Sequence, residues 1–378
     1  MKKKLGLFLL TLSLATAAAA QNETAGKPSF FSQLTQRMSE KNILNHMDVG
    51  VNVGTVGFGI DVAMPVGDYV RIRTGYNWIP SFNFKSDFPI DTRGGTMSKF
   101  VDKMKTIDVD KKMEEVGVDL NDPKFRKYKD LFDKFHDVEL KDQVTMGMKP
   151  NVHQFKFLVD VLPFKNNKHW SFTAGFFAGS SNVGNADNLD KETLLLEGVN
   201  AYNDLYVMYC QDGIAGNYHE KLDELFYKNG VAGIPLGYFD DGDKAIMVPA
   251  ANGVAHAEMR VGKVRPYLGF GYNTHLSKDK RWNLNVDAGV LFLCGKSHVY
   301  VDNVYKIDES KIDIDNYIYD IIRPNAEMTE FVVDEPLQHV DMVNDLRDIP
   351  GKVGDMVHKV KNFKVYPNAS VTFSYRLF

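Results

Sequence analysis

The chain has 378 residues, of which 25% are charged and 12% are aromatic, and its formal net charge is -4. This composition is typical of folded proteins, and the net negative charge argues against nucleic acid as a partner. The two cysteines, Cys210 and Cys294, exclude a disulfide-rich scaffold. One bridge between them and two free thiols both fit the sequence, and we favour two free thiols.

The N-terminus has the features of a secretory signal peptide. Lys2 to Lys4 form a positive region, residues 5–15 form an apolar stretch, and Ala18 to Ala20 provide small residues for cleavage after Ala20. No later run of residues is apolar and long enough for a membrane-spanning helix. Such an exported chain is periplasmic, extracellular or an outer-membrane barrel. The expected division is a signal peptide at 1–20, an N-terminal segment at 21–46 and a barrel with its insertions at 47–378.

Eight segments alternate apolar and polar residues with a period of two, which predicts strands with one apolar face. Short turn signals at 66–68, 165–168, 262–263 and 277–280 join four pairs of these segments into antiparallel hairpins. The eight segments are 56–64, 70–78, 154–161, 170–178, 255–261, 265–272, 282–292 and 368–377.

A soluble β-sandwich and a membrane barrel both produce such alternation, because each buries one face of every strand away from water. Here the polar phase consists largely of small or charged residues, which suit a narrow lumen. Trp78, Trp170 and Trp282 lie near strand ends, where membrane barrels carry aromatic girdles. We therefore predict a mainly β fold, an antiparallel transmembrane β-barrel of about eight strands with partly helical insertions.

The chain ends on an alternating strand, "YPNASVTFSYRLF". Together with the signal peptide and the hairpins, this ending resembles Gram-negative outer-membrane β-barrel proteins, in particular the small eight-stranded OmpA/OmpW-like barrels. The resemblance implies outer-membrane lipid and the barrel-assembly machinery as partners, with Phe373, Tyr375, Leu377 and Phe378 as the assembly signal. Family chains commonly end on two aromatic residues in phase, whereas Tyr375 and Phe378 are out of phase here, so Phe378 requires a bend or a bulge.

Three long insertions, 81–150, 180–251 and 295–363, separate the strands and carry apolar residues at helical spacing. We expect the helices to form a cap that binds a protein partner or stiffens the envelope. The predicted helices are 97–105, 122–135, 189–209, 218–227, 337–346 and 353–360.

The number of strands decides which insertions face outside. Eight strands with a periplasmic C-terminus would place the first two insertions in the periplasm and the third outside, the reverse of the family pattern. Two further candidate strands, 49–53 ahead of Gly54 and 298–301, would make ten. We prefer eight, because 49–64 shows no good turn, and the sequence leaves the sidedness open.

Charged residues of both signs fall on the polar phase of the predicted strands. An eight-stranded barrel is just wide enough for side chains to fill its interior, and charges buried there must pair because an unpaired buried charge is costly. We therefore expect an ionic network that plugs the lumen. Its predicted members are Asp61, Arg71, Arg73, Lys156, Asp160, Glu258, Arg260, Arg265, Asp287 and Arg376.

The sequence offers little catalytic chemistry. It has no G-x-S-x-G motif, and we interpret His256 beside Glu258 as structural, while His153 and His275 show no evident partner. The acidic runs 240–243 and 313–316 do not continue into a calcium-binding loop, so solvated turns explain them better. The sequence therefore predicts no enzyme, no cofactor and no metal, but a structural or partner-binding barrel. The alternatives are a small channel and, more remotely, a lipid-modifying enzyme.

Overall fold

The computed structural model describes residues 43–92, 95–96, 143–189, 195–201, 203, 232–250, 253–295, 297–307 and 336–377, with single residues at 106, 111, 123, 126, 129, 130 and 133. The predicted signal peptide, Cys210 and Phe378 lie outside the described residues, whereas Cys294 is exposed. Among the helices described, none has the length and apolar character of a membrane span.

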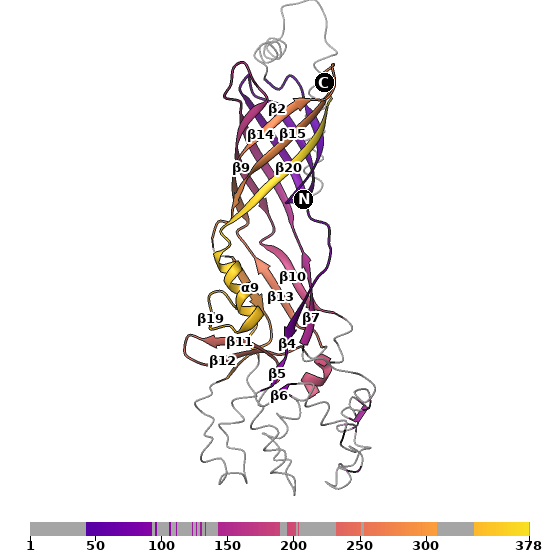
Figure 1. Ribbon diagram of the computed structural model, residues 1–378, viewed down its shortest axis with the longest axis vertical. Coiled ribbons are helices and arrows are strands. Elements are labelled where there is room, and N and C mark those ends of the chain that lie inside the picture. Colours follow the sequence, from indigo (N-terminus) through magenta and orange to yellow (C-terminus); the bar gives the residue numbers. More distant parts are fainter. Residues whose placement is uncertain are drawn as a thin grey trace, which may run out of the picture.

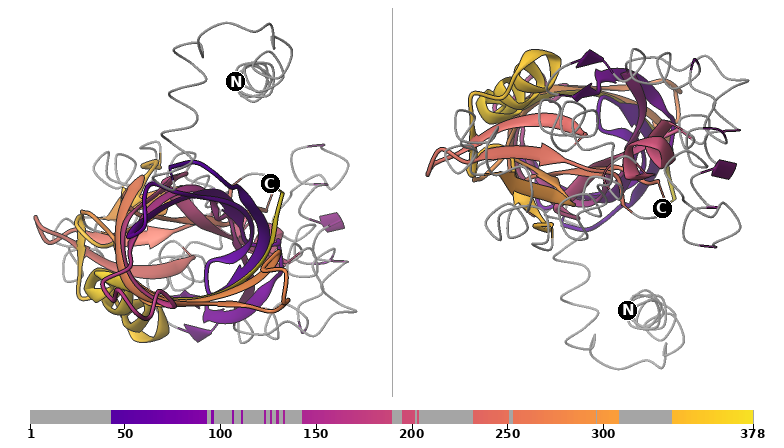
Figure 2. Two further views of the ribbon diagram at one scale, coloured as in Figure 1. Left: turned by 90° about the horizontal axis from the view of Figure 1, so that it is seen from above. Right: turned by 90° about the horizontal axis from the view of Figure 1, so that it is seen from below.

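Eight antiparallel strands close into a barrel, which confirms the predicted fold class. Figure 2 looks along its axis and shows the closed ring. The last strand pairs with the first, from Asp48 opposite Arg376 to Gly54 opposite Ser370, so the barrel has no open edge. In order around the barrel, the strands are β1 (Asp48–Gly54), β2 (Gly57–Pro65), β3 (Val70–Trp78), β8 (His153–Val161), β9 (Trp170–Gly179), β14 (Val264–His275), β15 (Trp282–Phe292) and β20 (Val365–Arg376).

The count of eight is right, but the predicted membership was wrong in one place. The candidate strand 49–53 is β1 of the barrel, and a tight turn at Thr55 and Val56 joins it to β2. The predicted strand 255–261 lies outside the barrel as β13 (His256–Arg260). Gly262 and Lys263 therefore do not form a hairpin turn. Strand β13 pairs with β10 and β16, whereas β14 pairs with β9 in the barrel.

This exchange of one strand places all three insertions at the same end of the barrel. The connections after β3, β9 and β15 leave from the end that also carries the β1–β2 turn. The short turns after β2, β8 and β14 lie at the opposite end, together with the start of β1 and the end of β20 (Figure 1). The sequence left the sidedness open, and with β1 in place of 255–261 a barrel of eight strands no longer divides the insertions between two sides.

Beyond the barrel rim the described residues form a second sheet, whereas we predicted only helices in the partly helical insertions (Figure 1). The strands of this sheet follow the same order as the barrel strands to which they are joined. The chain passes between a barrel strand and a sheet strand after a short break, for example from β3 to β4 and from β9 to β10. The candidate strand 298–301 belongs here and not in the barrel. The strands are β4 (Phe84–Pro89), β7 (Gln143–Pro150), β10 (Asn182–Asn188), β13, β16 (His298–Val301) and β18 (Val340–Asp341).

A four-stranded sheet and the helix α9 (Gly351–Asn362) complete this outer domain, and β5 (Asp91–Thr92) and β6 (Gly95–Thr96) form a small antiparallel pair. Helix α9 confirms the prediction for 353–360, since Val353, Met356, Val357 and Val360 share the face that packs on the core. The sheet consists of β17 (Val304–Ile307), β12 (Lys244–Met247), β11 (Ile234–Phe239) and β19 (Leu346–Arg347).

The predicted helix at 337–346 was wrong, because the segment forms β18, a turn and β19. Asp341 accepts a hydrogen bond from the backbone N–H of Val343 at 3.1 Å, and the Asp345 carboxylate accepts one from the N–H of Asp341 at 2.9 Å. Such local side-chain bonds favour turns over helices.

Part of the remaining helix prediction lies in the described chain. Residues 195–201 are helical within the predicted 189–209, as are the described residues of 122–135, where Lys129 and Asp133 form an i,i+4 ion pair at 3.2 Å. The predicted helices 97–105 and 218–227 lie outside the described residues.

Candidate functional site: the barrel lumen

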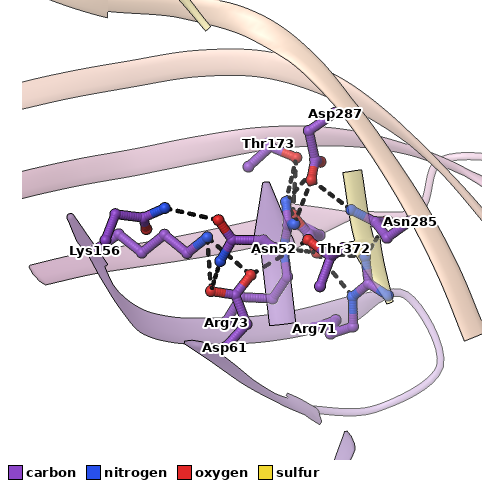
Figure 3. Close-up of polar contacts among 11 residues, drawn as sticks. Asn52, Asp61, Arg71, Arg73, Lys156, Thr173, Asn285, Asp287 and Thr372 are labelled. Carbon is purple, nitrogen blue, oxygen red and sulfur yellow. Dashed lines mark hydrogen bonds and ion pairs between the residues drawn. The ribbon is translucent and has the colours of Figure 1, made fainter. Parts of the chain in front are cut away.

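The barrel turns its polar phase inward and its apolar phase outward, the reverse of a soluble protein. On β15, Asn283, Asn285 and Asp287 are buried in the lumen. On the outer face, large apolar side chains are exposed, for example Val51 and Phe172, each 62% exposed. The site is therefore the buried polar interior, which Figure 3 shows in close-up.

Arg73 is the centre of the network. Its guanidinium binds Asp160 on the neighbouring strand β8, with Nη2 at 2.8 Å from Oδ1, and reaches across the lumen to Asp287 on β15, with Nη1 at 2.7 Å from Oδ2. Arg71 also binds Asp160, at 2.7 Å, and donates to Asn285 at 3.2 Å. Thr173 donates a hydrogen bond to Asp160 at 2.8 Å. One cation thus joins strands from opposite sides of the ring.

A second group of contacts surrounds Asp61. Lys156 donates to this carboxylate with Nζ at 2.7 Å from Oδ1, and Asn52 donates to the same oxygen at 2.7 Å. Asn77 in turn donates to Asn52 at 2.7 Å. Figure 3 shows Asn52, Asp61 and Lys156 converging on one another from separate strands. The charges are thus paired and hydrogen-bonded, as burial requires.

Two glycines on the inner face make room for these side chains. A Cβ on Gly75 would collide with the Asp61 carboxylate and with the backbone of Ile60. A Cβ on Gly59 would lie about 2.6 Å from Asn77 Nδ2, which is closer than atoms can approach. The small residues of the polar phase therefore serve the packing of the larger polar ones.

A small apolar cluster closes the lumen at the end that carries the insertions. It is formed by Val56, Leu158, Phe177, Tyr267 and Leu291, and all five side chains are buried. The Phe177 and Tyr267 rings contact edge to face, with centroids 5.7 Å apart. The cluster and the ionic network therefore occupy successive levels of the barrel interior.

The remaining predicted network residues lie elsewhere. Arg376 pairs with Asp48 at 3.1 Å near the short-turn end, while Arg265 donates to Gln154 at 2.7 Å and to backbone carbonyls instead of a carboxylate. The prediction that Glu258 and Arg260 lie in the lumen was wrong, because β13 is outside the barrel. There they form an ion pair with each other, and Arg260 lies over the ring of Tyr300.

Sequence reasoning missed the uncharged members of the network, Asn52, Asn77, Thr173, Asn285 and Thr372. All except Asn52 occupy the polar phase of a strand that was predicted, and Asn52 lies on the strand that was left out. The position of an amide or hydroxyl group on the inward phase of a strand is the signal that marks such residues.

The histidines and acidic runs have ordinary structural partners. His256 binds Asp187 at 2.6 Å, His153 lies 3.2 Å from the Tyr76 hydroxyl, and His275 contacts Asn283. In the run 240–243, a hydrogen bond from Lys306 lowers the pKa of the Asp241 carboxyl group. The run 313–316 lies outside the described residues, and among those described no group of His, Cys, Asp and Glu could hold a metal.

No family model matches the chain, and no curated protein matches it. Among solved structures, crystal structures of CarO2 and CarO from Acinetobacter baumannii are similar to it, with 13% and 12% sequence identity. The two comparisons cover 88% and 89% of this chain and 98% of each of those chains. The TM-score is 0.33 in both, too low to carry an argument, and the OmpA/OmpW-like family stays a resemblance in sequence features.

Proposed function

We propose that the chain is an integral outer-membrane β-barrel protein with a closed lumen, without enzymatic activity, which carries a cap that binds a partner or stiffens the envelope. The observation that carries the proposal is a barrel filled by paired charges and surrounded by exposed apolar side chains. A lipid bilayer covers such an outer face, whereas water would leave it exposed. The filled lumen disfavours a channel.

An aromatic girdle supports the membrane location. At the short-turn end, Trp170 contacts Tyr272 with ring centroids 5.0 Å apart, and Trp282 contacts Tyr375 at 4.8 Å and Phe373 at 4.9 Å. Aromatic side chains of this kind lie at the boundary between the apolar core of a membrane and its headgroups. At the opposite end, Trp78 terminates β3 close to the rim.

We expect the protein to fractionate with the outer membrane and to remain there after a carbonate wash. On gels the folded barrel should migrate differently before and after boiling, because the closed sheet resists detergent until heated. Recovery as a soluble protein of the periplasm would contradict the proposal.

The proposal also gives the barrel an orientation. Outer-membrane barrels have short turns on the periplasmic side and longer loops outside. The short turns after β2, β8 and β14 and the end of β20 share one end here, and the three insertions share the other. The cap would therefore lie outside the cell, and the C-terminal strand would end on the periplasmic side.

Labelling of single cysteines tests this orientation. In a chain with Cys210→Ser and Cys294→Ser, we expect an impermeant maleimide to label Lys352→Cys in α9 on intact cells. Lys165→Cys, in the turn after β8, should be labelled only after the outer membrane is permeabilised. Both lysines are exposed, so access to the reagent depends on sidedness. The opposite pattern would show that the cap faces the periplasm.

A further inference from the structure

The outer domain encloses an apolar cavity that the closed lumen does not explain. It has a volume of about 300 Å³ and an almost entirely apolar lining. The walls are formed by the six-stranded sheet, helix α9 and the four-stranded sheet, with residues such as Met148, Leu236 and Val357. Voids of this size are rare in packed cores, and the volume lies at the lower end of ligand pockets, about 300–1,000 Å³.

The lining is rich in methionine. Six of the 15 methionines in the chain face this one cavity. Methionine has three rotatable bonds and a polarizable sulfur, so a wall of methionines adapts to the shape of an apolar guest. These residues are Met146, Met148, Met247, Met259, Met342 and Met356.

The mouth of the cavity lies at an edge of the six-stranded sheet. The β1–β2 hairpin ends at its turn and α9 leads directly into β20, so neither extends the six-stranded sheet, whose edge strands are β4 and β18. Phe84 on the edge strand β4 lines the cavity and is also 59% exposed, so it lies at the mouth. Phe82 packs against it with ring centroids 4.6 Å apart and is exposed as well.

Exposed apolar side chains connect this mouth to the outer face of the barrel. Phe82 and Phe84 follow β3 by a few residues, and Phe363 and Val365 are exposed where α9 meets β20. Exposed apolar side chains therefore lead from the lipid-facing surface toward the mouth of the cavity. Two of the lining residues are charged, Lys149 and Glu258, and Glu258 is paired with Arg260. Apolar cavities of half this volume, about 150 Å³, already bind small hydrocarbons.

We propose that this cavity binds one long alkyl chain, either the acyl chain of a lipid in the adjacent leaflet or a free fatty acid. The inference rests on the proposed function, because the chain would enter from the surrounding membrane. The methionine wall and α9 contact the alkyl chain, and its polar head stays outside at the level of Phe84. The cap would thus bind an alkyl chain taken from the membrane in which the barrel is embedded.

Photocrosslinking of the full chain in phosphatidylcholine nanodiscs tests the inference. One arm uses palmitic acid with a diazirine at the end of its chain, and the other uses phosphatidylcholine that carries the same acyl chain. We expect at least one probe to label peptides that contain Met148, Met259 or Met356, and excess unlabelled palmitate or lipid of the same kind to compete. The arm that labels these peptides identifies the source of the chain.

Variants that fill the cavity can be compared with a variant on the outer face of the barrel. Ala257→Phe, with Ala186→Phe as a second variant, should lower labelling of the cavity by about tenfold, because the added ring occupies the space of the alkyl chain. Ala174→Phe, on the exposed outer face of β9, should leave that labelling unchanged.

Labelling of the outer barrel face at Phe172 is the internal standard. If Phe172 is labelled but the cavity is not, or if neither competitor lowers cavity labelling, the inference is wrong and the proposed membrane location stands. If Phe172 and its neighbours on the barrel are not labelled either, the proposed membrane location fails first.

Discussion

Replacing Arg73 with methionine is expected to destabilise the folded barrel by about 3–5 kcal/mol, the cost of removing one partner from a buried ion pair. Arg73 is 3% exposed and bridges Asp160 and Asp287. Without it, Asp160 still binds Arg71, but Asp287 has no other ion-pair partner among the described residues. The free energy of unfolding in lipid vesicles, measured with urea and a gel shift for the folded form, gives the effect.

Two further variants distinguish the loss of a buried ion-pair partner from a general loss of positive charge. Lys165→Met removes a cation from an exposed turn and should change stability by no more than about 0.5 kcal/mol. Combining Arg73→Met with Asp287→Asn should recover part of the lost stability, because a neutral amide then replaces the carboxylate that has no ion-pair partner. An Arg73→Met barrel as stable as the Lys165→Met barrel would show that water reaches the lumen and screens its charges.

Deleting Phe378, or replacing it with aspartate, is expected to slow the appearance of folded barrel and to leave precursor for periplasmic proteases. Phe378 lies outside the described residues, so this prediction rests on the resemblance of the C-terminal strand to an assembly signal. The structure adds that β20 pairs with both β1 and β15, so its arrival closes the barrel. Pulse-chase with the folded-form gel shift measures the rate.

The variant Phe378→Tyr keeps an aromatic ring at the terminus and should assemble at the wild-type rate. A different outcome is expected if Phe378 only covers apolar surface, worth about 1.5–3 kcal/mol at most. The deletion would then assemble normally and lose thermal stability alone. Equal assembly rates for the wild type and the deletion would therefore contradict an assembly role.

The alternation of side chains was enough to predict the barrel and its inward-facing charges, but not which strands belong to it. The tight turn after β1 was missed because Val56 continues the apolar phase and is buried in the lumen. Contacts with β20 fix this turn, since Thr55 donates to the Pro367 carbonyl at 3.1 Å and Tyr366 donates to the Thr55 carbonyl at 2.7 Å. Partners this distant in sequence leave no local signal.

Strand β13 illustrates the opposite error. Ala257 and Met259 alternate with polar residues as lipid-facing residues do, but they line the cavity of the outer domain. A period of two shows that one face of a strand is buried, and it does not show whether lipid or protein covers that face. Glu258 and Arg260 were assigned to the lumen for this reason.

The most direct measurement of the closed lumen is the conductance of the purified full chain in planar bilayers. We expect no sustained ohmic current, because the Arg73 and Asp61 groups and the apolar cluster at Phe177 fill the interior at successive levels. Folded protein, verified by its gel shift, must be present in the same bilayers. Steady open-channel currents from that folded protein would contradict a closed lumen and would favour a small channel.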